Sequence, residues 1–242
     1  MHRFLPLALV AVAGSLAGSF AASARAMEAV DHASSPSAEG SEDALTPRGV
    51  QVSARVGYGL PAGSVAQGTS LASVDTAMTS FWIDAGWRFS RHLFVGAFAQ
   101  LGVVELDHGA FGGGCNDPSN DCTARDWRFG VEAHWHFAPG RAFDPWVGLG
   151  VGYEIHSLSV DASGATAPTA TPVAATKEKG FELADLQVGG DFRLAPHVGL
   201  GPFAAVTLGQ FSSCTSDAGD CALGGKAFHA WLLGGVRGVF DV

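Results

Sequence analysis

The sequence has little charge. Asp, Glu, Lys and Arg make up 15% of its 242 residues, against about 25% in a typical soluble domain. Basic residues are the scarcer kind, with 14 Lys and Arg against 23 Asp and Glu and a formal net charge of −9. This balance excludes a typical nucleic-acid binder, which needs a basic surface to meet phosphates. The 47% of hydrophobic residues also excludes a wholly disordered chain.

Long apolar runs are absent after the first 26 residues, so no helical membrane span is expected in the rest of the chain. At the start, a short basic segment precedes an uncharged stretch over 4–22, and residues 24–26 are Ala-Arg-Ala. This pattern predicts a secretory signal peptide over residues 1–26, with a retained membrane anchor as the alternative. Residues 27–48 are rich in Ser, Ala, Glu and Asp without an aromatic residue, which predicts a disordered acidic linker.

Cysteine is scarce, and its four copies fall in two pairs, Cys115 with Cys122 and Cys214 with Cys221. Both pairs have the same spacing, and the Cys-x-x-Cys spacing of zinc sites is absent. In an exported protein this predicts two local disulfides, one in each of two long loops. Pairing between the loops is the alternative, since four cysteines allow three connectivities.

From residue 49 onward the hydrophobic pattern has a period of two, which is typical of β-strands with two unlike faces. One face is apolar in every segment, and the other carries Gly with polar and charged residues. Eight segments of about ten residues or more, the length that a tilted strand needs to cross a bilayer, follow one another. They are residues 50–60, 80–89, 93–104, 126–137, 146–157, 182–194, 198–211 and 228–242.

The connections between these segments alternate in length. The short ones are residues 90–92, 138–145 and 195–197, and the long ones are 61–79, 105–125, 158–181 and 212–227. Short turns at one end and long loops at the other are the pattern of an outer-membrane barrel. The sequence therefore predicts an all-β fold, an eight-stranded antiparallel up-and-down transmembrane β-barrel over residues 49–242.

The apolar face is expected to point outward into lipid. The interior of an eight-stranded barrel only just holds its own side chains, and the apolar set with its Trp and Phe is too bulky for it. Aromatic residues also gather near both ends of the segments, as in the girdles at the two interfaces of a bilayer. The predicted girdle residues are Tyr58, Trp87, Phe89, Trp127, Trp135, Phe137, Tyr153, Phe192 and Phe240. A soluble lipocalin-like carrier, with the apolar face inward, is the alternative.

In these features the sequence resembles the small eight-stranded outer-membrane β-barrel proteins, the group that includes the OmpA transmembrane domain and OmpX. The resemblance covers residues 49–242 and rests on the strand pattern. It implies the outer membrane of a Gram-negative bacterium, with outer-membrane lipid and lipopolysaccharide as partners. It also implies recognition of the aromatic last strand, here with Phe240, by the barrel-insertion machinery. We expect a monomer and no nucleic-acid partner.

The second face of the segments predicts a polar network inside the barrel. Its charges have mixed signs, which suits ion pairs between Arg forks and carboxylates. If the 138–145 turn sets His136 opposite Trp146, then Arg128 lies opposite Glu154 as an inward pair. The expected network comprises Arg55, Asp84, Arg88, Arg128, Glu132, Glu154, Asp185, Arg193 and Arg237. We interpret it as a polar plug, and the alternative is a salt-bridge gate in a narrow ion path.

Glu132, His134 and His136 share the inward face at a spacing that could begin a metal site. His156 and His229, however, belong to the long-loop end and cannot complete it. We therefore expect no metal and no cofactor, and interpret the histidines as members of the polar network.

The predicted function is a surface-structural or adhesive role through disulfide-braced extracellular loops, because recognition concentrates on loops held by rigid scaffolds. A narrow ion or small-solute channel is the second hypothesis. A lipid A-modifying enzyme is the third, because some small outer-membrane barrels are such enzymes and Ser157 and Ser159 lie near His156. Gly-x-Ser-x-Gly, His-Glu-x-x-His and P-loop motifs are absent, so an enzyme is not expected. A soluble carrier is the fourth.

Overall fold

The computed structural model describes residues 49–107, 115, 120–162 and 174–242. The predicted signal peptide (1–26) and linker (27–48) lie outside these ranges. Within them the chain is almost wholly β-structure, apart from a 3-10 turn, η2 (Leu71–Ser73). No helix in the described ranges is long and apolar enough to cross a membrane.

Eight long strands make up the fold of the described residues. They are β1 (Gly49–Ala66), β3 (Asp75–Arg88), β4 (Leu93–Leu106), β5 (Asn120–His136), β6 (Phe143–Ala162), β7 (Ala174–Ala195), β8 (Val198–Ser216) and β10 (His229–Asp241). Two short strands pair at the hairpins, β2 (Thr69–Ser70) with β1 and β9 (Gly219–Cys221) with β8.

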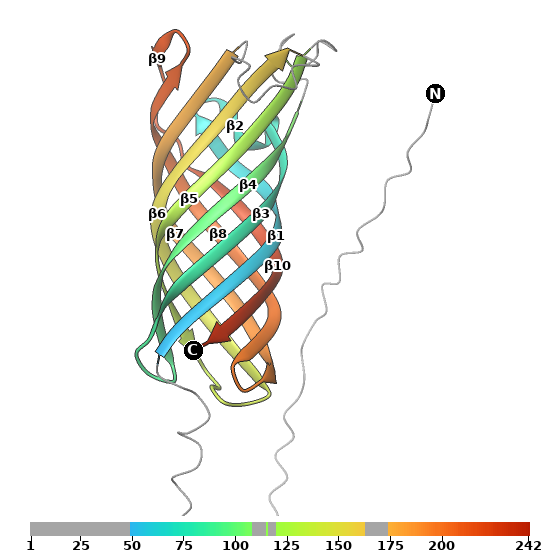
Figure 1. The fold of residues 1–242 in the computed structure, drawn as a ribbon. Helices are drawn as coiled ribbons and strands as arrows, with labels where there is room; N and C mark the ends of the chain where they lie inside the picture. Colours follow the sequence, from blue (N-terminus) through green and yellow to red (C-terminus); the bar gives the residue numbers. More distant parts are fainter. Residues whose placement is uncertain (1–48, 108–114, 116–119, 163–173) are drawn as a thin grey trace, which may run out of the picture. The chain divides into compact units, whose positions relative to one another are not determined.

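The sheet closes on itself (Figure 1). Each long strand pairs antiparallel with its neighbours in sequence, and β10 pairs with both β8 and β1. Closure satisfies the strand hydrogen bonds without leaving an edge, which is what hydrocarbon requires of a spanning sheet. The predicted eight-stranded antiparallel barrel is confirmed.

Short turns join the strands at the end where β1 begins and β10 ends (Figure 1). We call this the turn end and the opposite one the loop end. In the turn between β5 and β6, Gly140 has a φ of 84°, a left-handed conformation that glycine adopts without a steric cost. His136 lies opposite Trp146 and Arg128 opposite Glu154, which is the register that the sequence predicts for this hairpin.

At the loop end the strands extend well beyond the predicted segments. β1 continues past residue 60 to Ala66, and β7 begins at Ala174 instead of residue 182. Much of what the sequence predicts as long loop is therefore strand. The apolar alternation stops where lipid stops, but the backbone ladder continues, so the sequence pattern ended before the strands did.

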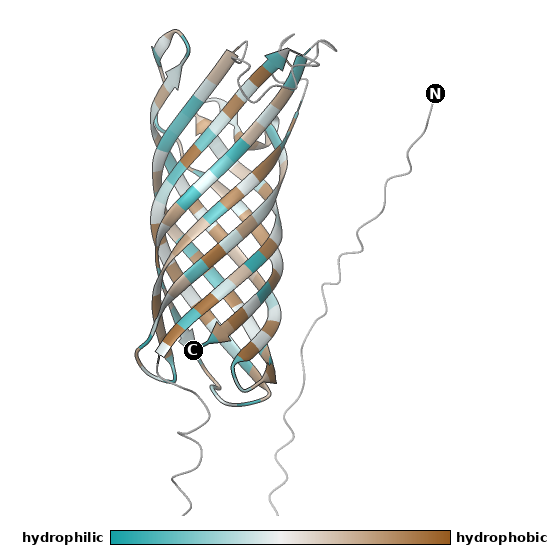
Figure 2. Cartoon of the chain, in the orientation of Figure 1, coloured by the Kyte–Doolittle hydropathy of each residue, from teal (hydrophilic) through white to brown (hydrophobic). Residues whose placement is uncertain are grey.

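Hydrophobic residues alternate with more polar ones along the strands (Figure 2), and the large hydrophobic side chains of this alternation lie at the outer surface. These side chains are exposed, for example Ile83 at 62% and Leu186 at 57% of their full surface. A belt of this size in contact with water would be an aggregation surface, whereas in lipid it costs nothing. The lipocalin-like alternative is wrong, because the apolar set lies outside.

The predicted girdle residues all lie at the outer surface. Tyr153 is half-buried, with its ring centroid 5.8 Å from Phe129 and 5.4 Å from Phe181. The other eight are exposed: Tyr58, Trp87, Phe89, Trp127, Trp135, Phe137, Phe192 and Phe240. Phe181, in the predicted 158–181 loop, belongs to β7 because this strand begins earlier than predicted, and its side chain is also exposed on the loop-end side.

Candidate functional site: the barrel interior and its mouth

The inward side chains gather around three arginines. We call these groups the turn-end cluster (Gln51, Arg88, His136, Asp144, Asp241), the central cluster (Arg55, Asp84, Glu132, Gln187) and the mouth-side cluster (Asp126, Arg128, Glu154, Thr207, His229). Almost all of these side chains are buried. Charges in such a setting must be paired to be tolerated.

The central cluster is built on Arg55 of β1. Its Nη2 atom lies 2.8 Å from Asp84 Oδ2 and 2.9 Å from Glu132 Oε1, and its Nη1 donates to Gln187 Oε1 at 2.7 Å. The guanidinium also lies over the ring of Trp82, 4.4 Å from the ring centroid, a favourable cation–π geometry. Strands β1, β3, β5 and β7 are thus joined across the interior.

The turn-end cluster is neutralised less tightly. Arg88 donates from Nε and Nη2 to Gln51 Oε1 at 3.0 and 2.6 Å, and its distance to Asp241 is 3.9 Å. The Nδ1 atom of His136 lies 3.0 Å from Asp144 Oδ2. This cluster closes the turn end of the interior with hydrogen bonds between β1, β3, β5 and β6.

The other two predicted arginines also lie toward the turn end. Arg237 pairs with Asp191 at 2.8 Å and donates to Ser53 Oγ at 3.2 Å. Arg193 lies at the rim, with 21% of its side chain exposed, 3.6 Å from Asp241. An ion pair at an exposed rim contributes little to stability.

The mouth-side cluster is built on Arg128 of β5. Its Nη2 atom lies 2.6 Å from Glu154 Oε1 and 2.8 Å from Asp126 Oδ2, and its Nη1 donates to Thr207 Oγ1 at 2.8 Å. Glu154 also lies 2.6 Å from His229 Nε2. One guanidinium therefore serves two carboxylates directly.

Aromatic side chains fill the space among the clusters. Trp82 contacts Phe98 and Phe203, with ring centroids 5.4 and 6.2 Å apart, and Trp146 stacks on His134 at 4.8 Å. Trp82, Trp146 and Trp231 are among the largest fully buried side chains. The interior is a packed core of ion pairs and aromatic rings.

Inward glycines make this packing possible. A Cβ atom on Gly102 would come within 2.1 Å of Met78 Sδ, and one on Gly189 within 2.5 Å of the Trp146 ring. A glycine in a strand marks such a close approach. The Gly-rich inner face thus provides room for large neighbours on adjacent strands.

Beyond the mouth-side cluster, a cavity of about 350 Å³ lies at the loop end of the interior. Its walls come from β1, β3, β6, β7 and the segment after β9, with Val65, Val74, Leu158 and Leu223 as larger apolar residues. Asp75, His156 and Glu178 supply its titratable groups. We call it the mouth cavity.

Asp75 is the buried acid of the mouth cavity. It has no exposed surface, and neither carboxylate oxygen accepts a hydrogen bond from the described residues. The Nε2 atom of His156 lies 4.0 Å from Asp75 Oδ2. The pKa of Asp75 is raised to about 7, mainly by burial and then by the nearby charges of Glu178 and Glu154, against a lowering by His229. Burial likewise raises the pKa of Glu178.

Five acids of the interior could not be placed from hydrophobic periodicity, each for a local reason. Glu178 falls in the predicted 158–181 loop. Glu182 points inward because a bulge between residues 182 and 184 shifts the strand register, so simple alternation gave it no inward place. Asp144 belongs to β6, which begins before the predicted segment. Asp75 falls in the predicted 61–79 loop. Asp126, at a segment boundary, was assigned to neither face.

Asp185 is the predicted network residue without an arginine contact among the ion pairs of the described residues. Its Oδ2 atom accepts a hydrogen bond from Gln187 Nε2 at 2.6 Å. The same amide also donates to Glu132 Oε2 at 3.0 Å. Gln187 therefore connects Asp185 to the central cluster.

Both disulfides are local. Cys115 joins Cys122 and Cys214 joins Cys221, with Cα–Cα distances of 5.7 and 5.1 Å. The second pair sits directly opposite in the β8–β9 hairpin. The predicted local pairing is confirmed, and pairing between loops is excluded.

The residues proposed for other chemistry do not assemble. No group of three His, Cys, Asp or Glu side chains able to hold a metal occurs in the described part of the chain. His134 and Glu132 lie 3.1 Å apart, but His136 contacts Asp144 instead. The hydroxyl of Ser157 donates to the carbonyl of Arg125 at 3.3 Å, and Ser157 and His156, as consecutive strand residues, face opposite sides.

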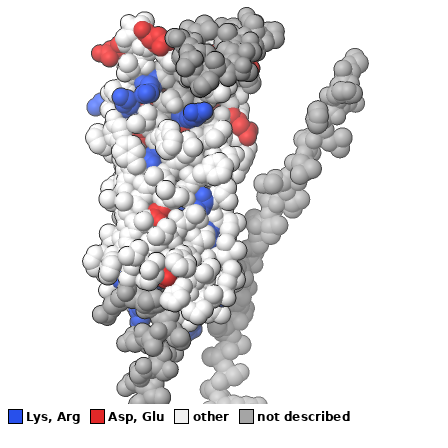
Figure 3. Space-filling view, viewed as in Figure 1, with Lys and Arg blue, Asp and Glu red and all other residues white. Residues whose placement is uncertain are grey.

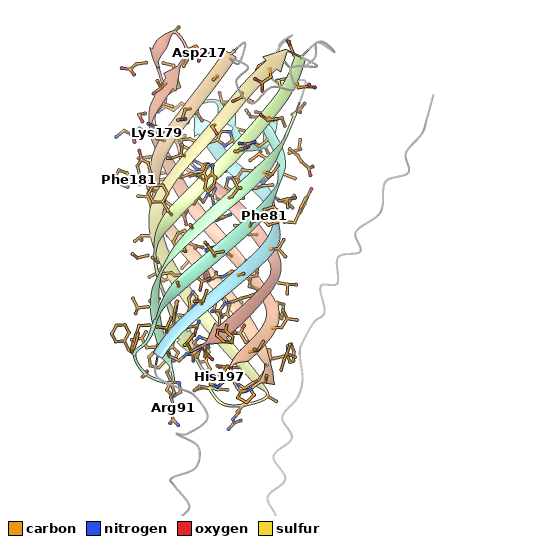
Figure 4. All side chains as sticks on the ribbon, viewed as in Figure 1. Phe81, Arg91, Lys179, Phe181, His197 and Asp217 are labelled. Atoms are coloured by element: carbon orange, nitrogen blue, oxygen red, sulfur yellow. A yellow bond between two sulfur atoms is a disulfide. The ribbon has the colours of Figure 1, made fainter. Side chains whose placement is uncertain are left out.

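Basic residues lie outside the barrel just beyond the loop-end aromatics. Arg125 lies opposite Ser157, and Ser157 opposite Lys177, so the row crosses β5, β6 and β7. Lys179 lies beyond Phe181 toward the loop end, where Lys and Arg are visible on the surface (Figures 3 and 4). A groove of about 440 Å³ beside Lys177 and Lys179 includes hydroxyl groups from β6, β7 and β8.

No protein-family model matches the chain, and no curated protein is similar to it in sequence. Among solved structures it is similar to Neisserial surface protein A (NspA), at 16% identity and a TM-score of 0.46, over 80% of this chain and 97% of that one. It is similar to Ail, the attachment invasion locus protein of Yersinia pestis, at 13% identity and a TM-score of 0.41, over 79% and 99%. It is also similar to the outer membrane protein OprG from Pseudomonas aeruginosa, at 13% identity and a TM-score of 0.43, over 82% and 99%.

The outer surface of the barrel indicates the membrane in which the protein lies. A closed antiparallel barrel with an apolar outer belt, aromatic residues toward both ends of that belt and a polar interior is the architecture of outer-membrane proteins. The described strands combine these features. The chain is an outer-membrane β-barrel protein.

Proposed function

We propose that this barrel has a surface-structural or adhesive role and presents a rigid, disulfide-braced edge outside the membrane. The observation that carries the proposal is the continuation of the strands past the loop-end aromatics. β7 runs for seven residues before Phe181, from Ala174 to Gly180. Backbone pairing holds this extension in shape, and a preorganised surface loses little entropy on binding.

The packed interior supports this role over the channel hypothesis. Ion pairs cross the interior at Arg55 and Arg128, and the rings of Trp82, Phe98 and Phe203 lie among them. The two hypotheses differ in planar bilayers. We expect no single-channel openings from the mature protein, and regular openings would support the channel instead.

Adhesion is tested on cells that display the protein. The matched control replaces residues 212–221 with an Asn-Gly turn, which removes the β8–β9 hairpin and its disulfide but leaves the belt and residues 222–224 of the mouth cavity intact. We expect the intact protein to increase attachment to wells coated with serum proteins or cell–cell sedimentation, and the trimmed barrel to lose much of the gain. Equal behaviour of both cell types would contradict the proposal. Unchanged lipid A mass spectra in the same cells would oppose the enzyme hypothesis.

The basic row supports contact with lipopolysaccharide as the surrounding partner. Arg125, Lys177 and Lys179 lie just beyond the loop-end aromatics, at the level expected for headgroup phosphates. Exchange of all three for Gln should reduce the lipopolysaccharide that copurifies with the barrel. Exchange of Arg91 and Arg141, on the turn-end loops, should not.

A further inference from the structure

We propose that the mouth cavity is a binding site for a small organic cation, an ammonium group with a short apolar body. The residues that define it are Asp75, Glu178 and the apolar side chains around them. This site is independent of the proposed adhesive role, since it lies inside the barrel ring.

The acidic head of the site is Asp75. A buried carboxyl group whose oxygens accept no hydrogen bond from the described residues is costly, unless it is neutral or a donor reaches it. Asp75 is one of the residues that line the cavity. An ammonium group has three donors and a positive charge, so it meets both needs of this carboxylate.

The surrounding charge favours a cation over an anion. Glu178 of β7 lines the same cavity, and Glu154 of β6 lies close enough to raise the pKa of Asp75. Arg128, below the cavity, is already engaged by Asp126 and Glu154. The facing bases are His156 of β6 and His229 of β10, and His229 is held by Glu154 at 2.6 Å.

The walls favour an apolar body. Val65, Val74, Leu158 and Leu223 surround the cavity, and Thr69 and Thr176 are among its polar residues. A volume of about 350 Å³ is at the lower end of small-molecule sites. Three of the cavity's lining residues, Thr69, Ala222 and Gly224, are exposed.

The experiment uses the mature chain folded in detergent micelles and follows its backbone amide resonances during titration. The probes are butylammonium, butanol as the uncharged match and butyrate as the anionic match. We expect saturable shifts at residues around Asp75 with butylammonium alone. Equal shifts with butanol would show that the cavity binds apolar molecules without a preference for a cation, which would contradict the proposal. The absence of shifts with all three probes would show that the cavity is not a binding site.

Two variants make the assignment specific. Asp75→Asn keeps the size of the side chain, and we expect it to weaken butylammonium binding by about tenfold or more, the value of one charge-assisted contact. Asp220→Asn makes the same change at the exposed β8–β9 hairpin, outside the cavity, and should bind as the wild type does. Amide spectra and heat-modifiable gel migration establish that both variants fold. Unaltered binding by Asp75→Asn would refute the proposal.

The pH dependence gives a second readout. Burial raises the pKa values of Asp75 and Glu178, so the site becomes more negative as the pH rises. The other titratable groups that face it are Glu154, His156 and His229. We therefore expect butylammonium affinity to rise by about tenfold or more between pH 5.5 and pH 8. A flat profile would show that Asp75 does not form the contact.

Discussion

The two halves of the interior hold their charges differently. Toward the turn end, four arginines face six carboxylates among the described residues: Arg55, Arg88, Arg193 and Arg237 with Asp84, Glu132, Asp144, Asp185, Asp191 and Asp241. Toward the mouth, Arg128 alone faces Asp75, Asp126, Glu154, Glu178 and Glu182 in the described chain, with His156 and His229 as the other bases.

This difference suggests that the charges toward the turn end stabilise the barrel, whereas the excess acids at the mouth are free to bind a ligand. Toward the turn end the buried charges are closer to balance, and each carboxylate lies beside an arginine, a histidine or Gln187. The excess of acid at the mouth leaves Asp75 and Glu182 without hydrogen bonds among the described residues. A ligand that donates a hydrogen bond to a buried carboxylate without a partner gains affinity from that contact.

Among the variants that test this difference, removal of Arg128 should lower the unfolding free energy most. Arg128→Met leaves Glu154 and Asp126 buried without their guanidinium, which costs about 3–5 kcal/mol of unfolding free energy. Arg88→Met should cost less, because Arg88 contacts Gln51 and lies 3.9 Å from Asp241. Urea unfolding in micelles, followed by heat-modifiable migration, measures both.

A compensating double variant sharpens this test. Arg128→Met with Glu154→Gln should recover part of the lost stability, since one unpaired charge is removed. Arg193→Met at the rim serves as the control and should change little. If Arg128→Met and Arg193→Met were equally stable, the mouth-side cluster would not depend on its arginine.

Removal of two buried aromatic side chains should open a path for ions, and the excess of acid at the mouth should make that path selective for cations. Trp82→Ala with Trp146→Ala removes two of the largest buried side chains, and we expect channel openings that the wild type lacks. The acidic mouth predicts cation selectivity, because a cleft of one sign concentrates counter-ions. The reversal potential in a KCl gradient measures it. An anion-selective current would contradict the charge assignment.

Neutralising Asp75 should have a smaller effect that depends on pH. Its pKa rises from 3.8 to about 7 on folding, so the folded barrel loses stability as the pH rises through that range. Asp75→Asn should therefore melt about 5 °C above the wild type at pH 8 and show little gain at pH 4. The melting temperature of the compact form on gels measures this. A gain of the same size at both pH values would rule out ionisation as the cause.

The disulfide at the β8–β9 hairpin should matter least to the barrel. Its ring closes only a short loop, worth about 2.5 kcal/mol of chain entropy, and acts locally. Cys214→Ser with Cys221→Ser should speed proteolysis of the hairpin and leave the unfolding midpoint of the barrel unchanged. A large fall in the midpoint would show that the hairpin supports the closed sheet.

Much of the fold was predictable because lipid imposes a strict alternation. Residues such as Ile83 and Leu186 mark the outward face, and the short 138–145 connection sets Arg128 opposite Glu154. The limits of this signal are equally physical. Beyond the membrane, β1 and β7 continue without an apolar face, so their ends could not be read from hydrophobic periodicity.

The partners inside the barrel were harder to predict. Period two says that Arg55 points inward, but not that it meets Asp84, Glu132 and Gln187 from three other strands. Those contacts depend on strand stagger around the ring, and the bulge near Glu182 shifts one strand by a residue.

The sequence by itself determined the outward face, the number of spanning strands and the local cysteine pairs, because each follows from near neighbours in the chain. Only the tertiary structure decided which charges meet, how the rings of Trp82 and Trp146 fill the interior, and that Asp75 lines a cavity. These features depend on ring closure, which brings distant residues together at distances that no local pattern encodes.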